Sequence, residues 1–111
     1  MSAGVNTLRG GANALRGEAA LRVAGEIYRL RPSFAALVAA EAELGPLFAL
    51  VDRAAAGGLR LDELARLLWH CIAERPAAVS VEAVGEAVVE AGLVQVTPAL
   101  RMMLLQILQG R

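Results

Sequence analysis

The residues most capable of chemistry in this chain are Trp69, His70 and Cys71, which follow one another in the sequence. A thiol beside an imidazole can act as a nucleophile with its general base. The surrounding pattern, however, predicts a helix, in which successive side chains point about 100° apart, so His70 and Cys71 do not face each other. The chain has one His and one Cys, too few for a typical zinc site. We therefore expect Cys71 to be a core residue and His70 a surface or boundary residue, with no catalytic or metal-binding role.

Two carboxylate pairs are the other candidates for acid–base chemistry. Glu41 and Glu43 are two positions apart, and Asp62 and Glu63 are adjacent. Neither spacing brings two side chains together along a helix, so we expect solvated or capping residues. Every basic residue is Arg, which excludes a Schiff-base or P-loop lysine. The sequence thus predicts no enzyme, no cofactor, no metal and no small-molecule substrate.

Composition narrows the classes of partner. The chain of 111 residues has the length of one domain and is 57% apolar, with 11 acidic residues balancing 11 basic ones. Dispersed Arg residues on a neutral chain do not form the basic stripe of a nucleic-acid-binding protein. The longest segment without a charge is residues 91–100, which is too short to span a membrane. A single Cys and the lack of an apolar N-terminal signal segment favour a cytoplasmic protein.

The sequence predicts a flexible leader at residues 1–17 and a single domain at residues 18–110. Polar and apolar side chains alternate along residues 16–34, and this pattern predicts a β-hairpin at the start of the domain. A turn at Ala24-Gly25 sets Leu21 opposite Tyr28 and Ala19 opposite Leu30, whereas a turn at Gly25-Glu26 sets Val23 opposite Tyr28. Either register gathers four apolar side chains on one face: Leu21, Val23, Tyr28 and Leu30. We expect this face to cover the protein's own helices, around Phe34 and Leu37. The alternative is that it meets a partner, in which case Tyr28 belongs to the interface.

About five short helices are expected after the hairpin. Ser33 can cap the first, which Gly45-Pro46 ends, and residues 46–56 form the second. The third helix starts near Asp62 and continues to Arg75-Pro76. The fourth helix covers residues 81–91, with Ser80 as its cap. The fifth helix covers residues 99–109 and follows Thr97-Pro98. The first helix should bury a stripe formed by Phe34, Leu37, Val38, Glu41 and Leu44. The predicted fold is therefore mainly α: an N-terminal two-stranded hairpin followed by a compact helical bundle.

The last helix is apolar on most of its circumference. Its main apolar face consists of Leu100, Met103, Leu104, Ile107 and Leu108. Met102 and Leu105 extend this face nearly round the helix, and such a helix is either central to the core or buried against another chain. Both interpretations remain open at this stage. If the helix meets another chain, Met102 and Leu105 are the candidate partner-binding residues, and the protein should form a homo-oligomer.

The order of these features resembles the gene transfer agent and siphophage tail assembly chaperone family. That family opens with Arg-Gly-Glu, two short strands around a Gly turn, a Tyr-x-Leu-x-Pro segment and a helix that ends in Glu-x-x-Leu-Gly. The matching residues here are Arg16, Gly17, Glu18, Gly25, Tyr28, Leu30, Pro32, Glu41, Leu44 and Gly45. The family turn commonly carries Asp or Asn before the Gly, where this chain has Ala24.

The resemblance implies a non-enzymatic role in tail assembly. Such chaperones bind the tape measure protein, keep its apolar helices soluble and help recruit tail tube subunits. Members have also been labelled tail tube proteins, so a structural tail tube or minor virion subunit is the first alternative. A small cellular helical adaptor is the second.

Overall fold

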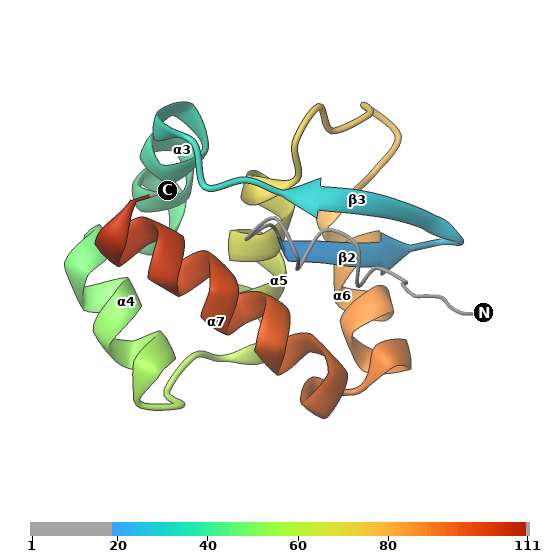
Figure 1. Ribbon diagram of the computed structural model, residues 1–111. Helices are drawn as coiled ribbons and strands as arrows, with labels where there is room; N and C mark the ends of the chain where they lie inside the picture. Colours follow the sequence, from blue (N-terminus) through green and yellow to red (C-terminus); the bar gives the residue numbers. More distant parts are fainter. Residues whose placement is uncertain (1–18, 111) are drawn as a thin grey trace.

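The computed structural model describes residues 19–110 (Figure 1), so the expected flexible leader lies outside the described residues. The chain begins with an antiparallel hairpin of β2 (Ala19–Val23) and β3 (Glu26–Leu30). Leu21 pairs with Tyr28 and Ala19 with Leu30, which confirms the first of the two registers. Ala24 and Gly25 have φ values of 50° and 86°, the conformation of a two-residue hairpin turn whose twist matches that of the strands.

Five helices follow within the described residues, which confirms the predicted fold class. They are α3 (Phe34–Leu44), α4 (Leu47–Ala55), α5 (Leu61–Cys71), α6 (Val81–Ala91) and α7 (Leu93–Gln109). Ser33 and Ser80 each cap a helix, because their hydroxyls accept hydrogen bonds from the N–H groups of Ala36 and Ala83. These are the two caps that the sequence predicted.

The hairpin and α5 organise the core (Figure 1). Leu21, Val23 and Leu30 are buried, and Tyr28 is half-buried against them. β2 packs on α7 and α6, and α5 packs on α3 and α6. The expectation that the hairpin face packs around Phe34 is wrong, because Phe34 is 85% exposed.

The buried face of α3 differs from the predicted stripe. Ala40 is fully buried and Ala36 partly so, together with Leu37 and Leu44. Phe34, Val38 and Glu41 of the predicted stripe are instead exposed. A stripe chosen from large side chains identified only Leu37 and Leu44 of this face. Small Ala side chains also allow helices to pack closely, and here they make up the other half of it.

α5 ends at Cys71, four residues before the predicted stop at Arg75. Ile72 is buried in an extended conformation and forms a β-bridge with Leu30. The Arg31 N–H donates to the Cys71 carbonyl at 2.6 Å, and the Ala73 N–H donates to the Arg29 carbonyl at 2.8 Å. This segment therefore covers part of the outer edge of β3, which is not available there for another strand.

α7 begins at Leu93 and includes Pro98, so the predicted start at Thr97-Pro98 is wrong. Pro98 lies in the second turn of the helix and has no N–H to donate to the Val94 carbonyl, so α7 lacks that hydrogen bond. The Thr97 hydroxyl donates to the Leu93 carbonyl at 2.6 Å and adds a hydrogen bond in the same turn. α7 runs across the molecule from α6 toward α3 (Figure 1).

Residues 19–110 contain apolar helices of different lengths. No single helix there is long and apolar enough to cross a bilayer; the pairs α3–α4 and α6–α7 meet the length and composition requirement jointly, but they are bent by 84° and 119°.

Candidate interaction surfaces

Cys71 has the environment of a core residue. Its side chain is fully buried in α5, as the sequence predicted. Burial raises the pKa of the thiol to about 12. The thiol is therefore protonated near neutral pH. Since the thiolate is the reactive form, Cys71 is unreactive there.

His70 belongs to a contact between α5 and α3. Its Nε2 lies 2.7 Å from Oε1 of Glu43, and Nη1 of Arg66 donates to the other oxygen of the same carboxylate. The hydrogen bond with His70, followed by that with Arg66, lowers the pKa of Glu43. His70 is a boundary residue, as expected, and the three side chains join the two helices.

Trp69 is fixed by the segment that follows α5. Its indole Nε1 donates to the Val79 carbonyl at 2.8 Å. The Arg75 guanidinium stacks 3.6 Å from the centre of the indole ring and donates to the Trp69 carbonyl. The contacts of Trp69, His70 and Cys71 are thus those of packing residues.

The two carboxylate pairs serve as caps and ion pairs. Oε2 of Glu41 accepts from the Leu47 N–H at 2.9 Å, at the start of α4. Oε1 of Glu63 accepts from the Arg60 N–H at 2.9 Å and from Arg53 at 2.8 Å. The Arg53 and Arg60 hydrogen bonds lower the pKa of Glu63. Within residues 19–110, no group of three or more His, Cys, Asp or Glu side chains is placed to hold a metal ion.

α7 has one buried and one exposed apolar side. Val96, Met103 and Leu104 are buried, whereas Val94 is 85% exposed, Leu105 52% and Leu108 60%. Pro98 and Arg101 are also exposed, and the five exposed positions alternate spacings of four and three residues, which places them on one side of the helix. We call this set the outer stripe of α7: Val94, Pro98, Arg101, Leu105 and Leu108. The core interpretation therefore holds for one side of this helix, and the other side is exposed.

The three residues proposed for partner binding occupy different environments. Leu105 belongs to the outer stripe, whereas Met102 is partly buried against the core and Tyr28 is half-buried on the inner face of the hairpin. Leu108, which the sequence assigned to the core face, is exposed. Sequence reasoning missed Val94 as a surface residue, because the helix was expected to start after it. The alternating spacing of four and three residues from Val94 to Leu108 is visible in the sequence and could have identified this side of the helix.

Exposed apolar side chains are also found on α3 and α4. Phe34 and Val38 are exposed one turn apart on α3, and Phe48 of α4 is 83% exposed. Phe34 lines a cavity of about 330 Å³ together with Gln106 and Gly110. Exposed apolar side chains thus occur on α3 and α4 as well as on α7, and such surface commonly marks an interaction site.

Comparison with known proteins identifies the family. A family model described as "Phage tail tube protein, GTA-gp10" matches residues 16–110. The chain belongs to this family. The match extends from the start of the hairpin to the end of α7, and it confirms the resemblance to gene transfer agent tail proteins. No curated protein and no solved structure matches the chain.

Membership of this gene transfer agent family gives the exposed surface a context. Proteins of a phage-type tail act within an assembly, and the family suggests contacts with other tail proteins. The family is in general structural rather than enzymatic. The outer stripe of α7 is therefore the candidate contact surface, rather than a catalytic site.

Proposed function

We propose that this protein is a non-enzymatic tail assembly chaperone that binds the tape measure protein in the cytoplasm and helps recruit tail tube subunits around it. The observation that supports this role most is the outer stripe of α7. It offers exposed apolar side chains at the spacing with which two helices pack along their length. From Val94 to Leu108 it extends about 21 Å, or about four turns, which suits a long apolar helix as the partner.

Arg101 favours a different chain over a symmetric copy as the partner of this stripe. It is the one charged residue in the stripe and lies at its centre. Two copies that paired antiparallel through this surface would bring their Arg101 side chains together, and like charges repel. Self-association through the stripe should therefore be weak. A partner helix with apolar residues and a carboxylate opposite Arg101 should displace the second copy.

The alternative is a structural tail tube subunit, which the description of the matching family favours. In that role the outer stripe would be covered permanently by a neighbouring subunit. The two roles differ in whether the protein stays in the finished particle and in whether the tape measure protein needs it to remain soluble.

Co-expression and particle analysis test the proposal. Tape measure protein expressed with this protein should be soluble and should co-purify with it, and it should aggregate when expressed alone. Purified mature particles should then lack the protein. If particles contain it in amounts comparable to the major tail proteins, and tape measure solubility does not depend on it, the structural alternative is correct.

A further inference from the structure

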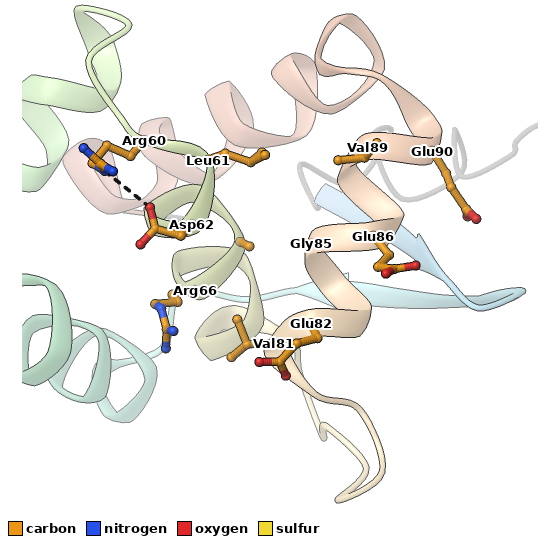
Figure 2. Close-up of a pocket in the computed structure, with 11 residues that line it drawn as sticks. Arg60, Leu61, Asp62, Arg66, Val81, Glu82, Gly85, Glu86, Val89 and Glu90 are labelled. Atoms are coloured by element: carbon orange, nitrogen blue, oxygen red, sulfur yellow. Dashed lines mark ion pairs between the residues drawn. The ribbon is translucent and has the colours of Figure 1, made fainter.

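A groove between α5 and α6 forms a surface separate from the outer stripe (Figure 2). Its cavity volume is about 850 Å³, and no residue of α7 lines it. The apolar part of its lining consists of Leu61, Ala65, Val81, Gly85 and Val89. Leu61 and Val89 are 51% and 64% exposed. The groove thus exposes apolar side chains that the described part of the chain does not cover.

The floor of the groove is formed by small residues. A Cβ atom at Gly85 would lie 3.7 Å from the Cβ of Ala65, so the two helices meet closely at this point. Ala65 is buried, and Gly85 presents only backbone. Small residues at such a position let the backbone of a third element approach.

The charges on the two sides of the groove differ. On the α5 side, Arg60 lies 3.6 Å from Asp62, and Arg66 is paired with Glu43 of α3. On the α6 side, three carboxylates follow one another at successive turns: Glu82, Glu86 and Glu90 (Figure 2). All three are exposed, and none has an ion pair within residues 19–110. The α6 side therefore carries uncompensated negative charge.

This row of carboxylates is unfavourable for α6 itself. Like charges four residues apart on a helix repel each other, and both steps of the row have this spacing. Glu90 also lies in the last turn, beside the negative end of the helix dipole, and that turn contains no basic residue. Cations supplied by another chain would relieve both effects.

We propose that the α5–α6 groove binds a cationic amphipathic helix of a partner protein. Its small or apolar side would cover Leu61, Gly85 and Val89, and its Lys or Arg residues would pass along the α6 side. A helix repeats side chains on one face every three to four residues, which is the spacing of the three carboxylates. One helix can therefore pair with all of them at once.

A second copy of this chain that docked through α7 would fit the groove less well. The exposed side of α7 brings a single cation, Arg101, to the three carboxylates. The proposal is independent of tape measure binding at α7, because the two surfaces share no residue.

A designed peptide probe tests the groove. The probe is a helix of about 18 residues with Ala and Leu on one face and Lys along one flank, and the control peptide has Glu in place of Lys. Fluorescence anisotropy with the full-length protein should show binding of the Lys peptide that weakens as salt is added. The Glu peptide should bind at least about tenfold more weakly.

Variants locate the binding site. Replacing Glu82, Glu86 and Glu90 together by Gln should remove the preference for the Lys peptide, with Glu26→Gln on the hairpin as the matched control. Leu105→Glu, on the outer stripe, should leave peptide binding unchanged, which separates this proposal from the proposed function. Equal affinity for the Lys and Glu peptides, or Lys-peptide binding that survives the triple substitution, would overturn the proposal. So would loss of self-association in light scattering on the triple substitution, because the occupant would then be a second copy.

Discussion

Cys71 and His70 illustrate what single residues reveal before a structure is known. The apolar spacing around Cys71 placed it in the core, and it is fully buried. The partner of His70 could not be predicted, because Glu43 is 27 positions away and meets His70 only through the packing of α3 on α5. Local periodicity determines which face of a helix is buried, whereas a polar contact between helices depends on the tertiary arrangement.

The buried thiol gives the first prediction. Cys71→Ser should lower the free energy of unfolding by about 1–3 kcal/mol, because it buries a hydroxyl in an apolar site, and Cys71→Ala should also destabilise the fold. Thermal unfolding followed by circular dichroism measures both. The Cys71 thiol should not react with a thiol reagent in the folded protein and should react once the protein is unfolded. Stoichiometric zinc in protein purified without added metal, lost on substitution of Cys71, would contradict the packing role.

The contact of Glu43 with His70 and Arg66 gives a pH prediction. The pKa of Glu43 is lower in the folded protein than its ordinary value of 4.5. Its ionised form therefore stabilises the fold above about pH 4.5, and this stabilisation is lost as the pH falls through the lowered folded pKa. Glu43→Gln should cost up to about 1 kcal/mol at neutral pH, since the site is partly exposed.

Urea unfolding between pH 3 and pH 7 tests this prediction, with Glu26→Gln as the control. The parent and the control should lose stability more steeply on acidification than Glu43→Gln does. Identical pH profiles for the parent and Glu43→Gln would show that the contact contributes nothing.

The hairpin turn gives a third prediction. Ala24 has a φ of 50°, a left-handed conformation that costs a residue with a Cβ about 1 kcal/mol and that Asn and Asp tolerate better. Ala24→Asn should therefore raise the unfolding midpoint by a few degrees. Ala24→Val, which should lower it, provides the opposite control. An unchanged or lower midpoint for Ala24→Asn would argue against this turn geometry.

At the scale of elements, the sequence predicted which helices and strands exist better than where they end. Gly and Ser punctuation located the hairpin, the capped starts of α3 and α6, and the Gly ends of α3 and α6. Pro98 was misleading, because a Pro in an early turn of a helix looks the same in sequence as a Pro at its start. The end of α5 was missed because Ile72 continues the helical spacing, yet pairs with Leu30 in the structure.

α6 gives a prediction at this scale. Glu90→Lys should stabilise the isolated protein by about 0.5–1 kcal/mol, because it pairs with Glu86 one turn earlier and places a cation at the helix C-terminus. Chemical denaturation of the parent and variant measures the difference, and Glu90→Gln separates the loss of repulsion from the gain of attraction. A variant less stable than the parent would show that the carboxylate row is not a strain on α6.

At the scale of the whole molecule, one fact could not be read from the sequence: which apolar residues the fold leaves uncovered. Leu104 and Leu105 are neighbours with the same side chain, yet they are 8% and 52% exposed. α7 packs against β2 of the hairpin and against α6, and this packing determines which of the two Leu side chains is covered. Composition indicated surplus apolar surface, and the structure locates it on the outer stripe of α7, in the α5–α6 groove and on exposed residues of α3 and α4.

The outer stripe predicts a specific pattern of self-association. The isolated parent should self-associate weakly, and fragments of the tape measure protein should compete with this association. Leu105→Glu should abolish it with normal helical content, whereas Leu104→Glu should unfold the domain, because it buries a charge in the core. Met102→Glu should fall between the two, since Met102 is partly buried. Light scattering with circular dichroism on the three variants distinguishes these outcomes.

The most direct test of the tail assembly role is the affinity of a tape measure fragment for the parent and for Leu105→Glu, measured by calorimetry on protein shown to be folded. The fragment should bind the parent, and its affinity for Leu105→Glu should be reduced by at least about tenfold, since a charge would be buried in the helix–helix contact. Equal affinity of the two proteins, or no binding to the parent at any concentration, would contradict the tail assembly role.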